Sequence, residues 1–351
     1  MRYRARVSVV ALAGVIAAVW LAPMLVGQTS ASSARSVAGA AAKADQSTAP
    51  ARAKASPRSR TPWGDPDLQG IWTNATITPF ERPSEFSGKQ VLSEGEAAEF
   101  AKKTNERNSI DRPPPPGNPG GYNQFWFDRG TRTAGKQSSL VVDPPDGKVP
   151  SLTPEAQKKS TERTAYQSAH PADSWEDVGL FTRCLTRGLP SAMTPGFYNH
   201  NYHFLQSPGY VAILVEMIHE TRIIPLDGRS HLGSDVRQWM GDSRGHWEGD
   251  TLVVETINFS PKAAYRGASP NMRLVERFTR VNADTMNYEF TVEDPTTWTK
   301  PWTASIPMTK DDAPKYIYEY ACHEGNYGIV NILAGHRAEE TAKEQAAQKT
   351  R

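Results

Sequence analysis

Short runs of alternating apolar and polar residues follow one another through the second half of the chain, each bounded by turn-forming residues. Alternation with a period of two residues is typical of β-strands that bury one face. The spacing predicts eight or nine short strands without a long helix between them. This pattern favours a mainly β fold, an antiparallel up-and-down barrel of the calycin or lipocalin-like kind. The predicted strands fall within 199–219, 220–227, 242–248, 251–259, 273–280, 286–292, 302–308 and 316–320.

The segment Arg237–Phe259 carries the most charged of these patterns. Read with the period of a strand, its titratable residues alternate with Ser243, Gly245 and Trp247. A Gly-Asp pair then supplies a tight turn before a second apolar run returns. We therefore expect a β-hairpin with one ionised face. That face would present Asp242, Arg244, His246 and Glu248.

The preceding residues, 61–198, are less regular and rich in aromatic side chains, proline and glycine. They predict a short strand at Gly70–Thr73, a helix over 91–107 with Ser93 as its N-cap, and a short helix from Pro154. We interpret 61–198 as a loop-rich extension that wraps a β-barrel domain at 199–337. The Ala-, Glu- and Lys-rich end, 338–351, predicts a polar tail.

The N-terminus has the features of a secretory signal peptide, residues 1–31. Three arginines precede an apolar run at Val7–Gly27, and small residues favour cleavage after Ala31. An uncleaved membrane anchor is the alternative, because about twenty apolar residues can span a bilayer. Residues 32–60 show no apolar period and predict a disordered linker. We expect a periplasmic or secreted protein that contacts the membrane only through its signal segment.

The net positive charge of the chain comes from its first sixty residues. Residues 1–60 hold nine Lys or Arg and one acidic residue, whereas the remainder holds 31 basic and 37 acidic side chains, a net charge of −6. A mildly acidic folded part without a recognition motif argues against nucleic acid as a partner. No phosphate-binding loop or dinucleotide fingerprint occurs, so a nucleotide cofactor is not expected.

Cys184 and Cys322 are the two cysteines of the chain. In an exported protein an even count predicts a disulfide, although two buried free thiols are the alternative. Closing so long a loop would stabilise the fold by about 4–5 kcal/mol in the chain-entropy model.

Several long motifs resemble those of a family of exported bacterial proteins for which no activity is established. The resemblance covers roughly Thr61 to Arg337 and implies export and a single family domain. It implies no catalytic residue. The motifs are GDPDLQGIW, SLVVDPPDGKVP, RIIPLDGR, WMGDSRGHWEGDTLVVET, LVERFTR and YACHEGNYG.

Glu216 and Glu255 lie within strongly apolar predicted strands. Because a buried carboxylate without a partner is costly, we expect cationic partners, for which Arg222, Arg244 and Arg277 are candidates. Such pairs are either structural or part of a cavity that binds a ligand, and aromatic side chains can line a cavity of that kind. The candidate ligand-binding residues are Glu216, Arg222, Glu255, Trp239, Trp247 and Tyr202.

These features support a binding protein for a small, partly apolar or aromatic ligand held in the barrel. An enzyme on the same barrel is the first alternative: a lyase, isomerase or hydrolase. In it His246 acts with Asp242 or Glu248 as acid or base, and Arg244 or Arg222 holds an anion. A structural envelope protein is the second. An ionised face that points into a cavity would favour the enzyme, and one that points to solvent would oppose it.

A metal site formed by His219, His246 and His323 is a further alternative, if the fold brings the three together. Because no HExxH or HxH spacing occurs, we predict no metal and no cofactor. The cluster His200–His203 is a weaker candidate of the same kind.

Overall fold

The computed structural model describes residues 59–109, 127–310 and 313–349, all within one unit, Lys54–Arg351. The predicted signal peptide, all but the end of the predicted linker, and the proline-rich loop lie outside the described residues. Described helices and strands are β1 Gly70–Thr73, η1 Ser84–Phe86, α1 Glu94–Asn108, β2 Val141–Asp143, α2 Pro154–Ala169, η3 Ser191–Met193, β3 Asn201–Ser207, β4 Tyr210–Val215, η4 Met217–His219, β5 Thr221–Pro225, β6 Asp242–Glu248, β7 Thr251–Ile257, η5 Pro261–Ala263, η6 Tyr265–Gly267, β8 Arg273–Arg280, β9 Thr285–Glu293, β10 Trp302–Thr309 and α3 Tyr327–Lys349.

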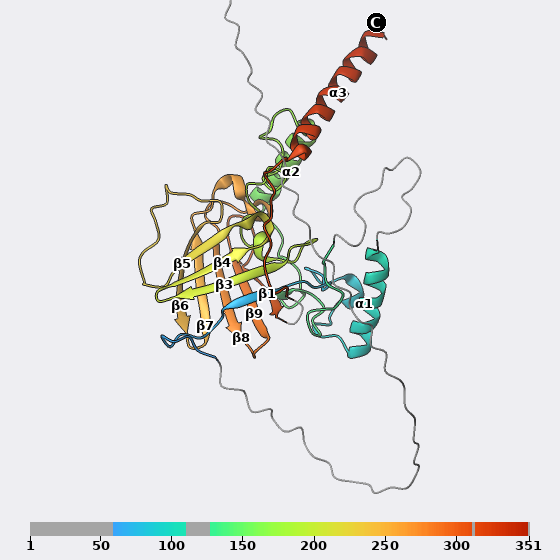
Figure 1. The fold of residues 1–351 in the computed structure, drawn as a ribbon. Coiled ribbons are helices and arrows are strands. Elements are labelled where there is room, and N and C mark those ends of the chain that lie inside the picture. Colours follow the sequence, from blue (N-terminus) through green and yellow to red (C-terminus); the bar gives the residue numbers. More distant parts are fainter. Residues whose placement is uncertain (1–58, 110–126, 311–312, 350–351) are drawn as a thin grey trace, which may run out of the picture. The chain divides into compact units, whose positions relative to one another are not determined.

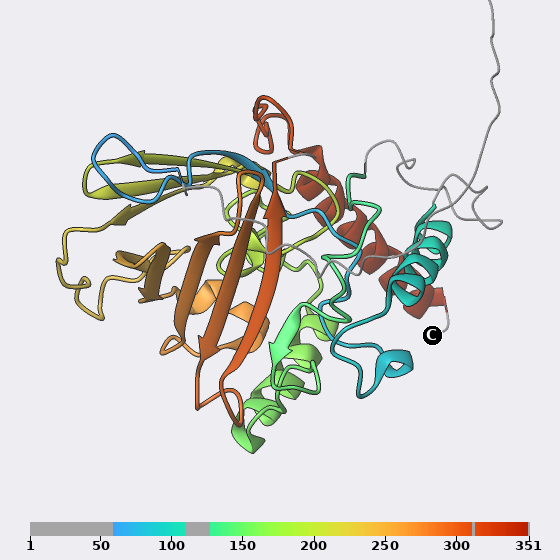
Figure 2. The ribbon, with the colours of Figure 1, turned by 90° about the horizontal axis from the view of Figure 1, so that it is seen from below.

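The ten strands form one antiparallel sheet, in the order β5-β4-β3-β1-β10-β9-β8-β7-β6, with β2 pairing beside β10. The prediction of a mainly β, antiparallel fold is confirmed. Apart from β1, neighbouring strands on the main path are neighbours in sequence, as consecutive hairpins require. Figure 1 shows β3, β4 and β5 crossing in front of β6 to β9. Figure 2 shows the same crossing of the strands from below.

The sheet is not closed. In the part of the chain that the structure describes, no ladder joins β5 to β6, so the prediction of a closed barrel is wrong at this seam. A Cβ added at Gly245 of β6 would lie 2.8 Å from the side chain of Ile224 and 2.7 Å from that of Leu226. Apolar side chains from β5 therefore lie against the β6 backbone. Pro225 also removes one backbone donor from the β5 edge.

The predicted extension supplies part of this sheet. β1 lies between β3 and β10, where Trp72 pairs with Tyr202, and β2 pairs with β10 through Val141 and Asp143. Trp72 and Tyr202 are fully buried. The regular half of the chain thus needs strands from the irregular half to cover its core.

The core lies on the concave inner side of the sheet, as alternation in β8 and β9 requires. Leu274, Glu276 and Phe278 of β8 are buried, while Val275 and Arg277, which alternate with them, are partly exposed. Large aromatic side chains pack edge-to-face or stacked here and fill the space between the crossing strands. The largest fully buried side chains include Trp72, Trp302, Tyr202, Tyr288, Phe204, Phe278 and Phe290.

Local signals place the helices. Ser93 and Glu96 form a capping box at the start of α1, and Thr153 caps α2 ahead of Pro154. The predicted strand at 316–320 is wrong: the segment is irregular, and the Tyr320 carbonyl binds His219 Nδ1 at 2.8 Å instead of joining a ladder. Helix α3 begins at Tyr327, earlier than the predicted tail. No described helix has both the length and the apolar composition needed to cross a membrane.

Candidate functional site

The predicted hairpin forms as β6 and β7, and its charged residues share one face of the strand. That face is the outer one. Gly245 is buried and Trp247 packs against the core, whereas His246 between them has 60% of its side chain exposed. The orientation of the strand is thus set by burial of its small and aromatic residues.

His246 and Glu248, toward the end of β6, contact charged partners at the surface. His246 Nε2 lies 3.2 Å from Glu248 Oε1, and Arg277 Nη2 lies 2.8 Å from Glu248 Oε2. The Arg277 bond is the main reason that the pKa of Glu248 is lowered. Because the pair lies in solvent, nothing holds a substrate between His246 and Glu248. The geometry gives no support to acid–base catalysis by His246.

Asp242 and Arg244 lie at the other end of the strand, under the loop that joins β5 to β6. Asp242 is buried; its Oδ2 accepts from the Leu232 amide at 2.8 Å and lies 2.9 Å from His231 Nδ1, and its Oδ1 lies 2.5 Å from Arg244 Nη1. Burial would raise the pKa of Asp242, but these bonds outweigh it and lower the pKa. The group anchors the loop.

The partners expected for the two strand carboxylates are wrong. Glu216 accepts from Asn201 Nδ2 at 2.7 Å, and Glu255 pairs with Arg273 and His231. Sequence spacing misses these partners because they lie on neighbouring strands or on a distant loop.

Arg222 points into the core and is 2% exposed. It makes a two-pronged ion pair with Glu276, which is fully buried, and one of the two bonds, Nη1 to Oε1, is 3.0 Å long. Tyr288 donates to the same Glu276 oxygen at 2.9 Å. Arg222 is therefore enclosed by protein and committed to this interior ion pair.

The three aromatic candidates also lie apart. Tyr202 is buried and accepts a bond from Asn74 Nδ2 at 3.0 Å, Trp247 packs on the core, and Trp239 is partly exposed. The structure does not bring the six predicted ligand residues together. Nor does it gather His219, His246 and His323, since the one group of described side chains with metal-ligand spacing contains none of them.

A pocket of about 570 Å³ lies elsewhere, between α2, the loop after Cys184, η4 and the segment that contains η5 and η6. We call it the arginine pocket. Its lining combines aromatic rings with four cationic side chains and includes no Asp or Glu. The lining residues are Phe80, Arg163, Leu180, Phe181, Thr186, Arg187, Ser191, Thr194, Pro195, Phe197, Met217, Lys262, Ala263, Ala264, Tyr265 and Arg266.

The four cations differ in their partners. Lys262 and Arg266 pair with Glu176 and Glu81 at 3.4 and 3.3 Å. Among the described residues, no carboxylate lies within ion-pair distance of Arg163 or Arg187. A cation that has lost part of its water and has no counter-ion favours an anionic ligand.

Arg187 is held in place by close contacts. Its Nη1 lies 3.3 Å from Met217 Sδ, and its guanidinium lies beside Gly196, where an added Cβ would approach Nη2 to 3.3 Å. Its backbone amide points at Glu220, which also accepts from the Thr186 hydroxyl at 2.8 Å. Burial raises the pKa of Glu220 despite these bonds. The missing side chain at Gly196 gives the guanidinium room.

His200 lies next to this guanidinium and is 1% exposed. Burial, followed by the positive charge of Arg187, lowers its pKa to about 4. Since Nδ1 accepts from the Gly196 amide at 3.4 Å, the proton of the neutral ring is on Nε2. Nε2 has no hydrogen-bond partner, and Asp128 Oδ1 is 3.7 Å away. His200 therefore stays neutral and leaves Arg187 as the charge of this region.

Aromatic rings also line the pocket, and cationic side chains lie close to them. Arg266 stacks over Phe80 at 4.6 Å and lies 5.8 Å from Tyr265, which is buried against the core. Burial raises the pKa of Tyr265 to about 12, so the phenol remains protonated. Phe181 lies 5.9 Å from Arg187. An aromatic ligand would therefore meet both rings and guanidinium groups.

Backbone strain gathers around this pocket. Ile218, a buried β-branched residue, has φ of 64°, and Cys184 and Asn199 both have φ of 56°. For Ile218 and Cys184 such values cost of order 1–3 kcal/mol each and persist only where surrounding structure enforces them, whereas asparagine adopts this region readily. Strain of this kind is found disproportionately at binding sites and active sites.

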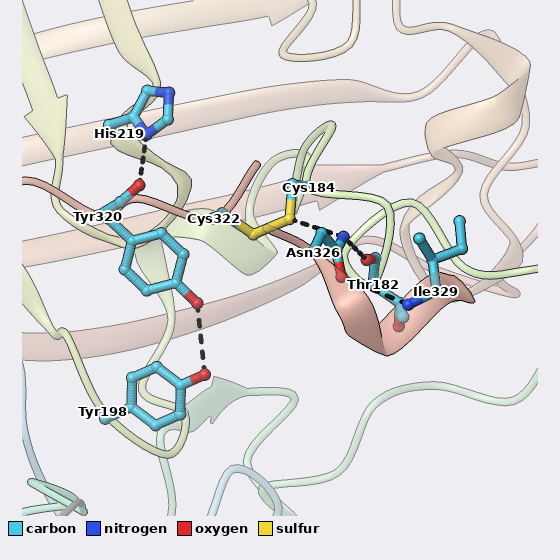
Figure 3. The surroundings of a disulfide bond; sticks show 8 residues. All are labelled: Thr182, Cys184, Tyr198, His219, Tyr320, Cys322, Asn326 and Ile329. Atoms are coloured by element: carbon cyan, nitrogen blue, oxygen red, sulfur yellow. Dashed lines mark hydrogen bonds between the residues drawn. A yellow bond between two sulfur atoms is a disulfide. The ribbon is translucent and has the colours of Figure 1, made fainter. Parts of the chain in front are cut away.

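The disulfide reinforces the same loops (Figure 3). Cys184 and Cys322 are bonded, as predicted, with their Cα atoms 5.6 Å apart. Asn326 Nδ2 donates to the Thr182 carbonyl at 2.9 Å, and the Tyr198 and Tyr320 hydroxyls lie 3.3 Å apart. The segment around Cys322 thus ties the Arg187 loop and the β3 entrance together.

The sequence prediction missed Arg163 and Arg187 as site residues, and it named His200 only as part of a weak metal candidate. Arg163 and Arg187 come from a helix and a loop of the predicted extension, where no periodic pattern marks a functional face. The one available signal was Cys184, because a disulfide would fix the loop that carries Arg187.

Neither a known family model nor a curated protein matches the chain. Among solved structures it is similar to a secretary abundant heat soluble (SAHS) protein from Ramazzottius varieornatus. Sequence identity is 16%, the match covers 35% of this chain and 78% of that chain, and the TM-score is 0.24. This similarity is too low to support an argument about fold or function, which must come from the site itself.

Proposed function

We propose that this protein is an exported binding protein that holds a small anionic ligand with an aromatic or apolar body in the arginine pocket. The observation that carries the proposal is Arg187: partly buried, positioned by Met217 and Gly196, and without a carboxylate partner among the described residues. A guanidinium presents several fixed donors to a carboxylate, sulfonate or phosphate group. The neighbouring His200 is neutral, so it does not compete for the anion.

The pocket volume supports a ligand of small-molecule size, since such sites are typically about 300–1,000 Å³. Arg163, which likewise has no carboxylate partner in the described part of the chain, lines the same pocket and offers a second contact for the anion. Phe181, Phe197 and Tyr265 provide apolar surface for the rest of the molecule. The sequence predicted a small, partly apolar or aromatic ligand, and we keep that class of ligand. We place its binding site in the arginine pocket instead of the barrel interior.

We also propose that the protein is exported and that its sheet is related to a barrel. The disulfide between Cys184 and Cys322 is supported by oxidising compartments such as the periplasm. We further infer that the sheet is an opened up-and-down barrel, because its strands follow chain order on both sides of the β5–β6 seam.

The test compares binding of 2-naphthoate and its neutral analogue 2-naphthamide to the purified protein by calorimetry. We expect the carboxylate to bind at least about tenfold more tightly, because a hydrogen bond to a charged group contributes about 1.5–3 kcal/mol. Arg187→Gln should remove that preference. Arg183→Gln is the matched control, since Arg183 lies on the same loop, stacks on Trp175 and does not line the pocket. Equal affinity for both probes, or equal loss in both variants, would refute the proposal.

A further inference from the structure

A second group of side chains lies away from the arginine pocket lining, where the turn after α2 meets α3. His336 Nε2 is 3.2 Å from Asp173 Oδ1 and 3.4 Å from Glu340 Oε1. The three ligand atoms all lie within 4.8 Å of one another. His336 and Glu340 share one face of the helix because they are four residues apart.

These distances are those of a coordination sphere. A tetrahedral Zn²⁺ ion with bonds of about 2.0–2.2 Å separates its ligand atoms by about 3.3–3.5 Å. The two separations from His336 Nε2, 3.2 and 3.4 Å, lie within about 0.1 Å of this range. Hydrogen bonding explains the arrangement less well, since Nε2 carries at most one proton and faces two carboxylate oxygens.

The surrounding contacts position the ligands. The second Asp173 oxygen lies 2.6 Å from His170 Nδ1, and Arg337 Nη1 lies 2.9 Å from the second oxygen of Glu340. Arg337 Nη2 also donates to the Ala172 and Asp173 carbonyls at 2.7 and 3.0 Å, which fixes the turn against α3. Carboxylate ligands that are themselves bound through their outer oxygens are usual around protein metal ions.

The three candidate ligands differ in how far their side chains are exposed. The His336 side chain is 12% exposed, while those of Asp173 and Glu340 are about two-fifths exposed, at 43% and 39%. An ion would thus be backed by the imidazole and reached from solvent through the carboxylates. This leaves room for water as a fourth ligand.

We propose that Asp173, His336 and Glu340 form a binding site for one divalent transition-metal ion of the Zn²⁺ type. An imidazole nitrogen with two carboxylates suits Zn²⁺, whereas Ca²⁺ and Mg²⁺ prefer all-oxygen sets with more ligands. The bound ion joins α3 to the turn after α2. Together with the disulfide, it gives the C-terminal helix a second attachment.

The experiment uses the full chain with its disulfide intact, stripped of metal by dialysis against a chelator. Zn²⁺ is added in a calorimeter, and Co²⁺ is added in parallel to record the visible absorption of a tetrahedral site. We expect one equivalent to bind, with His336→Ala and Glu340→Gln each weakening affinity at least tenfold. Ca²⁺ should not displace the ion.

Glu339→Gln is the matched control, because it removes the same charge from the adjacent position of α3 and leaves the three ligands in place. Circular dichroism checks that each variant is folded. Absence of saturable Zn²⁺ binding, or binding that His336→Ala leaves unchanged, would show that the group is only a set of ion pairs. A loss with Glu339→Gln as large as with Glu340→Gln would also overturn the proposal.

Discussion

Arg222 in the sheet interior and Arg187 at the arginine pocket show two different uses of a cation inside one fold. Arg222 is enclosed by aromatic side chains and pairs with Glu276, which Tyr288 also contacts. Arg187 is held by Met217 and Gly196 and has no carboxylate within reach among the described residues. The first arrangement leaves no charge to offer to a ligand, and the second does.

The difference between Arg222 and Arg187 indicates which part of the molecule can bind a ligand. In the sheet interior Arg222 and Glu276 pair with each other, and aromatic side chains fill the space that a ligand would need. The arginine pocket retains Arg187, which no carboxylate of the described residues pairs, together with strained backbone nearby. Charged residues in strand patterns are therefore poor guides to the site in this protein.

The largest effect should come from breaking the interior pair. Glu276→Leu leaves the Arg222 guanidinium buried and unpaired, which should lower the free energy of unfolding by about 3–5 kcal/mol in urea denaturation. The double variant Arg222→Met/Glu276→Leu should recover most of that loss, because no buried charge remains. A single variant as stable as the wild type would contradict the enclosed ion pair.

A smaller effect, on the pH dependence of stability, is expected from His200 beside the arginine pocket. Its pKa is lowered from the ordinary 6.5 to about 4 in the folded state, so the unfolded chain binds the proton first. The stabilisation is complete above pH 6.5 and is lost as the pH falls toward 4, by on the order of 3 kcal/mol.

His200→Gln should flatten this part of the stability–pH curve, measured by urea denaturation between pH 7 and pH 4. Other carboxylates titrate in both proteins, so the difference between the two curves isolates His200. Parallel curves would mean that His200 is protonated as easily in the folded protein as in the unfolded chain.

The smallest effect is expected on the outer face of the β6–β7 hairpin. His246→Ala should leave both the denaturation midpoint and naphthoate binding unchanged, because the His246–Glu248 contact lies in solvent and outside the pocket. A clear loss of naphthoate binding would show that the ligand binds at the hairpin and not in the arginine pocket.

The sequence by itself determined much of the local structure. Period-two alternation placed β6 to β10 within a residue or two at most ends, and capping residues placed α1 and α2. It also predicted the disulfide and the shared face of Asp242, Arg244, His246 and Glu248. These features depend on short-range geometry, which neighbouring residues encode directly.

Three features depend on the tertiary structure: which face of β6 is buried, which strands are neighbours, and which cation no described carboxylate pairs. Gly245 and Trp247 turned inward because Ile224 and the core received them, and that put His246 in solvent. Glu276 took Arg222 from across the sheet, while no described carboxylate reached Arg187. Such pairings join residues far apart in the chain, so periodicity and spacing carry no record of them.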